Sequence, residues 1–199
     1  ITTMGQGGNV FKLKFNMAIT NAYRIEYETK ANAPILDDTT IQNEVTTWTE
    51  EHSSASQNIT QVSLVKNVGT ADYIEKEVSW KIELNGNNQV MNHVVVTDGF
   101  PNKGMFFLED SLVITKGNVT LHSPTDYTLD PSISKYDGFK ISFNETLTEP
   151  VIITYRTNFD LSWIVPANST TIFHNSAQMN WSSTDENTYT KTVGAAFYP

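Results

Sequence analysis

The chain has 199 residues, with 13 Lys and Arg against 22 Asp and Glu and a formal net charge of −9. This acidic balance argues against nucleic acids and anionic membrane surfaces as partners, because both are held through Lys and Arg. The absence of Cys excludes disulfide bonds, thiolate nucleophiles and zinc–sulfur sites, and no apolar run is long enough to predict membrane insertion.

Strand patterns recur along the whole chain. Alternating or β-branched runs predict strands at 11–15, 23–27, 62–68, 78–84, 93–100, 139–143 and 151–155. Polar turn signals such as "NGNN" and "YDGF" separate them. No segment has a convincing helical period, although the run 106–117 could begin with a helical turn. Many short strands joined by polar turns predict an all-β fold, most simply a β-sandwich.

Two segments far apart in the chain are similar to each other. "FKLKFNMAITNAYRIEYETK" at 11–30 matches "FKISFNETLTEPVIITYRTN" at 139–158, so that Tyr27 aligns with Tyr155. Farther along, Asn43 aligns with Asn175. The spacing is that of a whole domain rather than of a solenoid repeat. Chance similarity between two hairpins is the alternative explanation.

The repeat predicts how the chain is divided. Residues 1–57 are interpreted as the C-terminal portion of an upstream repeat, and 58–185 as one complete repeat. Residues 186–199 are interpreted as a linker or the first strand of the next repeat. The chain is therefore expected to be a piece of a longer array. Since a partial repeat has open strand edges, residues 1–57 are expected to pack on the intact repeat or to form a strand-mediated homo-oligomer.

Three polar residues fall in register with apolar ones on predicted strands. Lys66 shares a face with Leu64 and Val68, while Asp98 and Asn175 each alternate with apolar neighbours. An amine, a carboxyl group and an amide are thus expected to point into the core. Burying any of them without a partner costs several kcal/mol, of the order of 2–7 for an uncharged polar group.

The three side chains can be explained in more than one way. They could form a buried ion pair with an added amide hydrogen bond, or a β-bulge could turn one of them outward. A chemical alternative also exists. Burial favours the neutral amine of Lys66 and the protonated form of Asp98, and a neutral amine is a nucleophile. Attack on the Asn175 amide, assisted by Asp98, would release ammonia and leave a Lys–Asn isopeptide bond.

Several motifs, taken together, resemble a known family. They are the strand that carries Lys66, "VSWKIELN" (78–85), "VVVTDGFP" (94–101), "YTLDPS" (127–132), "ITYRT" (153–157) and "FHNSAQMNW" (173–181). In this order they resemble the A-type collagen-binding adhesin domain of Gram-positive surface proteins. The resemblance implies an Ig-like β-sandwich with an isopeptide bond between Lys66 and Asn175, assisted by Asp98. Asn43 resembles the Asn of the upstream repeat and is expected to carry no such cross-link within this chain.

The resemblance also implies a function. We expect a structural and adhesive module of a cell-wall-anchored, extracellular adhesin, which is not an enzyme and needs no cofactor. Its expected partners are collagen or another matrix protein, together with neighbouring repeats of its own chain. The alternative is a carbohydrate-binding or accessory β-sandwich of a secreted hydrolase. The four histidines, His52, His93, His122 and His174, have no metal-ligand spacing, so no metal site is expected.

Overall fold

The computed structural model describes residues 2–6, 10–31, 35, 37–101, 104–160, 162, 172–184 and 186–199. The chain divides into two compact units, residues 1–33 and 34–199. This division differs from the boundary expected after residue 57, which stays a prediction. No α-helix occurs among the described residues, and hence none of them forms a helix able to cross a membrane.

The first unit is a hairpin followed by an extended segment. β1 (Thr2–Gln6) pairs antiparallel with β2 (Val10–Lys14). The strand expected at 23–27 does not form, since its backbone belongs to no described sheet. Aromatic rings hold the segment instead: the rings of Phe11 and Tyr27 lie 4.8 Å apart and those of Phe15 and Tyr23 lie 5.3 Å apart. The unit has no buried residue among those described.

The second unit begins with another hairpin. β3 (Thr39–Thr46) pairs antiparallel with β4 (His52–Ile59), from Thr39 opposite Ile59 to Thr46 opposite His52. Nearly every side chain of the hairpin is exposed, on both faces of the ladder. At its base, the backbone N–H of Gln61 donates to Asp38 Oδ1 over 2.7 Å. The hairpin therefore contributes little to the hydrophobic core.

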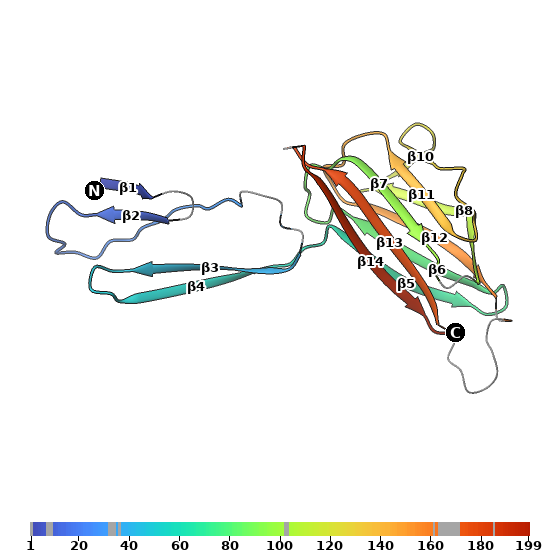
Figure 1. Cartoon of the computed structure of the whole chain (residues 1–199), viewed down its shortest axis with the longest axis horizontal. Helices are drawn as coiled ribbons and strands as arrows, with labels where there is room; N and C mark the ends of the chain where they lie inside the picture. Colours follow the sequence, from blue (N-terminus) through green and yellow to red (C-terminus); the bar gives the residue numbers. More distant parts are fainter. Residues whose placement is uncertain are drawn as a thin grey trace. The chain divides into compact units, whose positions relative to one another are not determined.

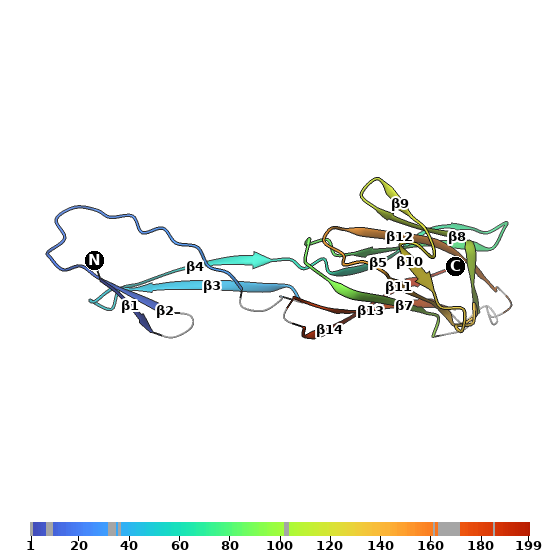
Figure 2. The ribbon, with the colours of Figure 1, turned by 90° about the horizontal axis from the view of Figure 1, so that it is seen from above.

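The remaining strands form the sandwich. In chain order they are β5 (Leu64–Asp72), β6 (Glu77–Leu84), β7 (Asn92–Gly99), β8 (Met105–Lys116), β9 (Val119–Leu121), β10 (Tyr127–Leu129), β11 (Gly138–Phe143), β12 (Val151–Phe159), β13 (Phe173–Ser182) and β14 (Thr188–Phe197). Among the described residues they make two five-stranded sheets, ordered β10-β11-β7-β13-β14 and β5-β6-β12-β8-β9. The sheets lie in two layers (Figures 1 and 2). Every pairing in them is antiparallel. The predicted all-β sandwich is confirmed.

The core follows from period-two alternation. In β6, Val78, Trp80, Ile82 and Leu84 are buried, and the residues between them are only partly buried. The same alternation runs along β7 and β13. Each sheet therefore presents one apolar face to the other, and burial of these faces stabilises the sandwich by roughly 25 cal/mol per Å² of apolar surface.

One prediction of local structure was wrong. The segment 106–117, expected to begin with a helical turn, belongs almost entirely to the long strand β8. β8 pairs with β12 on one side and β9 on the other, with a shift of register at the Thr154–Arg156 step of β12. The irregular pairing interrupts simple alternation along β8, which explains why its sequence carries no clean strand period.

Val68 is less buried than expected. It is 39% exposed, whereas Ala71 packs against the core. The pairing of β5 with β6 shifts register between these two residues. A bulge of this kind moves the inward face onto the other parity for the residues that follow it, here Ala71. Lys66 and Val68 both lie before the shift, on the same face as their buried partners Ile82 and Trp80. Val68 therefore keeps the inward parity but is incompletely covered.

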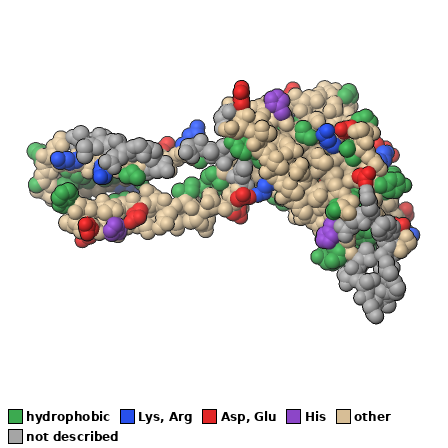
Figure 3. All heavy atoms as spheres, in the orientation of Figure 1, with side chains coloured by type: hydrophobic (Ala, Val, Ile, Leu, Met, Phe, Trp, Pro, Cys, Tyr) green, Lys and Arg blue, Asp and Glu red, His purple; other side chains and the backbone are tan. Residues whose placement is uncertain are grey.

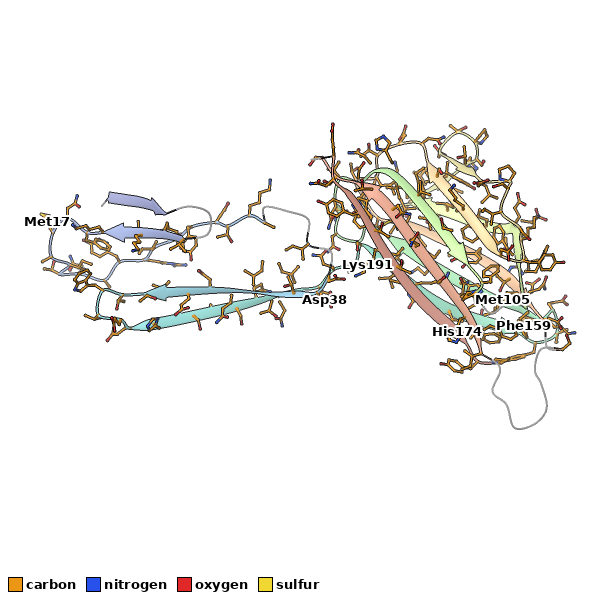
Figure 4. All side chains as sticks on the ribbon, viewed as in Figure 1. Met17, Asp38, Met105, Phe159, His174 and Lys191 are labelled. Carbon is orange, nitrogen blue, oxygen red and sulfur yellow. The ribbon has the colours of Figure 1, made fainter. Side chains whose placement is uncertain are left out.

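Residues 188–197 are a strand of the same sandwich rather than a linker. β14 pairs with β13 from Thr188 opposite Ser182 to Phe197 opposite Phe173. Phe197 is buried, with its ring 5.0 Å from that of Phe159 and 6.1 Å from that of Phe173. Figure 4 shows Phe159 and His174 at this end of the sandwich. The apolar face of β14 thus completes the core.

The surface of the sandwich is mixed. On the face shown in Figure 3, basic, acidic and hydrophobic side chains are interspersed, and Lys and Arg do not gather into one large patch. Pairs of opposite charge also lie at the surface of the domain, including Lys81 with Glu83 and Arg156 with Glu77. This face offers no extended basic footprint for a polyanion.

The fold predicts that Gly138 cannot be replaced by alanine without disturbing β7. Its φ of +129° lies in a region that L-residues rarely adopt, and an added Cβ would lie 1.9 Å from the carbonyl oxygen of Asp98. Backbone strain alone costs about 1–3 kcal/mol, and the clash adds to it. We expect Gly138→Ala to lower the free energy of unfolding in urea more than Gly117→Ala does.

Gly117 is the matched control, because its φ is +56° and an added Cβ would have only Glu149 Oε2 nearby, at 4.0 Å. Gly117→Ala should therefore show only the cost of the left-handed backbone, about 1–2 kcal/mol. Equal destabilisation by the two substitutions would contradict the close approach of Gly138 to Asp98.

Candidate functional site

Four polar side chains meet between the two sheets. Lys66 comes from the edge strand β5 and Tyr155 from β12, both in one sheet. Asp98 comes from β7 and Asn175 from β13, both in the other. β7 and β13 are paired, with Asp98 opposite Ala177. Strand alternation thus directs two side chains from each sheet into the same layer of the core.

All four residues are shielded from solvent. Asn175 is 0% exposed and Asp98 1%, while Lys66 is 6% exposed as a residue. The side chains of Lys66 and Asp98 are fully buried. The structure therefore brings together the three residues that the sequence singled out, and none of the three is turned outward by a bulge.

The hydroxyl group of Tyr155 lies at the centre of the cluster. Lys66 Nζ is 2.6 Å from it, and Asn175 Nδ2 donates a hydrogen bond to it over 2.8 Å. The hydroxyl itself donates to Asp98 Oδ1 over 2.7 Å. Lys66 Nζ also contacts Asp98 Oδ2 directly as a buried ion pair. The amine, the carboxyl group and the amide are therefore all hydrogen-bonded to the phenol of Tyr155.

One polar atom of the cluster is left over. Asn175 Oδ1 is buried and has no hydrogen-bond partner among the described residues. A buried acceptor without a donor typically costs about 1–3 kcal/mol. This oxygen belongs to the carbonyl group that a nucleophile would attack. The arrangement thus satisfies the amide nitrogen and leaves the carbonyl oxygen unsatisfied.

Burial controls the protonation of the pair. It lowers the pKa of Lys66, against the opposing attraction of Asp98. It raises the pKa of Asp98, against the opposing effects of Lys66, Tyr155 and Asn175. Both shifts favour the uncharged forms, a free amine and a carboxylic acid. The pKa of Tyr155 is raised well above its ordinary value by burial and by Asp98, so its hydroxyl keeps its proton.

Aromatic rings enclose the amine. Lys66 Nζ lies 5.2 Å from the centre of the Tyr155 ring and 5.5 Å from that of Trp80. The Tyr155 ring in turn contacts Phe139 edge-on, with the ring centres 4.9 Å apart. These rings exclude water and fix the Tyr155 side chain. The rings also favour the charged amine to some degree, which opposes the desolvation of Lys66.

Sequence reasoning missed Tyr155 as a member of this site. Two signals pointed to it: Tyr155 falls on the inward parity of β12 between Ile153 and Thr157, and it aligns with Tyr27 in the internal repeat. A buried tyrosine is common in a β-sandwich core, so neither signal marked the hydroxyl as part of a polar cluster. The meeting of β5, β7, β12 and β13 was needed to show this.

Other predicted positions lie elsewhere. Asn43 is an exposed residue of β3, opposite Ala55 of β4. The described residues contain no group of three or more His, Asp and Glu side chains placed to hold a metal ion. His93 Nδ1 instead lies 3.0 Å from Ser182 Oγ, and His52 Nδ1 lies 2.9 Å from Glu44 Oε1.

Known proteins resemble this chain in family and in fold. Residues 62–190 match the family model described as "Collagen binding domain". No curated protein matches the sequence. A similar solved structure is ACE19, the collagen binding subdomain of the Enterococcus faecalis surface protein ACE, with 14% identity and a TM-score of 0.55. The match covers 70% of this chain and 98% of ACE19.

Two further structures show the same fold. The collagen-binding domain from a Staphylococcus aureus adhesin has 11% identity and a TM-score of 0.52, over 71% of this chain and 100% of that one. The collagen binding domain of the Erysipelothrix rhusiopathiae surface protein RspB has 12% identity and a TM-score of 0.53. That match covers 82% of this chain and 57% of RspB.

The buried pair predicts strong coupling between Lys66 and Asp98. In an Asn175→Ala background, which removes the amide, Lys66→Met leaves a buried carboxyl group without its amine. We expect a loss of about 3–5 kcal/mol in the free energy of unfolding, measured with urea. Adding Asp98→Leu to Lys66→Met should recover part of this loss, because no unpaired buried carboxyl group then remains. Additive effects of the two substitutions would contradict the pairing.

Proposed function

This chain belongs to the collagen binding domain family, and from that premise we propose that it is an adhesive module of a Gram-positive surface protein whose sandwich is cross-linked by an isopeptide bond between Lys66 and Asn175. The family match and the sandwich fold support the adhesive role. They favour it over a carbohydrate-binding module of a secreted hydrolase. The observation that carries the cross-link is the buried cluster of Lys66, Asp98, Asn175 and Tyr155.

The reaction needs only groups that this chain supplies. Lys66 transfers one proton to Asp98 and becomes a neutral nucleophile. Its Nζ attacks Asn175 Cγ, a new C–N bond forms, and the bond from Cγ to Nδ2 breaks. The departing nitrogen takes up a second proton from Lys66 and leaves as ammonia. The products are a neutral secondary amide and a protonated Asp98, so no charge remains buried.

A bond at this place would join the two layers of the sandwich. β5 is the first strand of one sheet and β13 lies in the other, so most of the domain lies between Lys66 and Asn175 in sequence. Closing so long a loop restricts the unfolded chain strongly, as a disulfide does in other exported proteins. This chain has no Cys. The isopeptide bond would take over that stabilising role.

We place the module outside the cell, on the surface of a Gram-positive bacterium and attached to its wall through segments beyond this chain. Its proposed partner is collagen or another matrix protein. The support is the family match, together with the collagen-binding descriptions of the ACE and RspB structures. Neighbouring repeats of the parent protein are further proposed partners, and residues 1–57 are proposed as the C-terminal portion of one of them.

The proposed cross-link predicts that the measured mass of the chain is lower than the mass calculated from its sequence. Intact-mass spectrometry of the purified chain should give a value lower than the sequence mass by one ammonia molecule. Lys66→Ala and Asp98→Ala should each restore the full mass, because one removes the nucleophile and the other removes the proton acceptor.

Lys81→Ala is the matched control for that measurement. Lys81 lies on the adjacent strand β6 but is paired with Glu83 at the surface, with 43% of its side chain exposed. Its substitution should leave the mass deficit in place. A wild-type chain with its full sequence mass would overturn the cross-link while leaving the family assignment intact.

Adhesion predicts binding to native collagen. The whole chain should bind immobilised triple-helical collagen in surface plasmon resonance and should bind the heat-denatured form of the same collagen more weakly, since a domain that recognises the triple helix loses its ligand shape on denaturation. The absence of binding to triple-helical collagen would remove collagen as the partner, and fibronectin and laminin surfaces would then test other matrix proteins.

A further inference from the structure

We infer that Tyr155 is a catalytic residue of the cross-linking reaction, whose hydroxyl carries the proton from Lys66 to the departing nitrogen of Asn175. This inference rests on the proposed Lys66–Asn175 bond and adds a fourth residue to it. A hydroxyl that contacts both the attacking amine and the departing amide nitrogen is in the place where a proton must cross. Donor and acceptor lie within the distance that proton transfer requires.

The contacts of Tyr155 fit each end of the transfer. Lys66 Nζ lies 2.6 Å from the hydroxyl oxygen, which can accept its proton. Asn175 Nδ2 lies 2.8 Å from the same oxygen and donates to it before the reaction. When Lys66 attacks, Cγ becomes tetrahedral and Nδ2 becomes an amine with a lone pair. The direction of this hydrogen bond then reverses, and the hydroxyl donates its proton to Nδ2.

Lys66 must lose two protons, of which Asp98 accepts the first and the Tyr155 hydroxyl accepts the second. The first proton passes to Asp98, which contacts Nζ directly. The second is released as the new C–N bond forms, when Asp98 already holds a proton. The Tyr155 hydroxyl, which donates to Asp98 Oδ1 in the structure, turns its proton toward Nδ2 and takes the second proton from Nζ. The hydroxyl is a neutral phenol before and after the step.

The surroundings keep this hydroxyl in position. Tyr155 is 1% exposed, so bulk water cannot substitute for it as a proton carrier. Its ring is held edge-on against Phe139 and Phe107, with ring centres 4.9 and 5.8 Å away. A phenylalanine at this position keeps all of these ring contacts. The hydroxyl can therefore be removed without emptying the core.

The test compares the rate of bond formation in wild type and Tyr155→Phe. Whole chains made by cell-free translation are quenched in denaturant at intervals, and the cross-linked fraction is read from the loss of one ammonia in the mass. We expect Tyr155→Phe to form the bond roughly 10²-fold more slowly, the usual contribution of a positioned acid–base group. Equal rates in the two chains would overturn the inference.

Tyr127→Phe is the matched control, because Tyr127 is also a buried tyrosine of the sandwich with its ring 6.5 Å from that of Phe143. Its hydroxyl makes none of the hydrogen bonds of the cluster described above. This variant should react at the wild-type rate. Slowing as large as that of Tyr155→Phe would assign the effect to packing and overturn a specific role for Tyr155.

Two further measurements separate chemistry from folding. In the Asn175→Ala background, where no bond can form, Tyr155→Phe should leave a cooperative urea transition, which shows that the variant folds. 3-Fluorotyrosine at position 155 restores a hydroxyl of greater acidity and should recover the rate that phenylalanine loses. Failure of this rescue would overturn the inference. A full-mass wild-type chain would instead defeat the proposed cross-link itself.

Discussion

The central constraint on this structure is a Lys–Asp pair that is buried between two sheets with almost no access to water. Moving either charge out of water costs several kcal/mol, which the attraction within the pair repays only in part. Lys66 and Asp98 lie on opposite sheets, and both pKa shifts favour the uncharged forms. The buried pair therefore carries a desolvation cost, which condensation of Lys66 with Asn175 to a neutral amide would remove.

The sandwich provides what this chemistry needs. A β-sheet sends alternate side chains to one face, so strands from facing sheets can direct four polar groups into one layer. The apolar residues around them exclude water, and the rings of Trp80, Phe139 and Tyr155 restrict motion. Preorganisation comes from packing that the core requires in any case. A surface cluster of the same residues would be solvated and would keep its charges.

The hairpins before the sandwich differ from it in burial. β3 and β4 form a regular ladder, yet apolar residues such as Ile41, Val45 and Trp48 remain exposed. In β13, the strand to which β3 aligns, the corresponding face is buried by the opposite sheet. The same strand pattern thus gives a core strand in one context and an exposed ladder in the other. Exposed apolar positions on one face of a ladder are expected of a sheet that lacks its facing layer.

Local pattern in the sequence was enough to determine the all-β class, the strands β2, β5, β6, β7, β11 and β12, and the inward direction of Lys66, Asp98 and Asn175, because side-chain direction in a regular strand depends on parity. It was not enough for Val68, which is 39% exposed beside a bulge although it keeps the inward parity, or for 106–117, where irregular pairing hid a strand. The place of β14 in the sheet and the position of the Tyr155 hydroxyl among the three buried polar side chains were decided by tertiary structure alone. Both depend on which strands lie side by side and which face each other across the core, and those choices are made by packing between residues far apart in the chain.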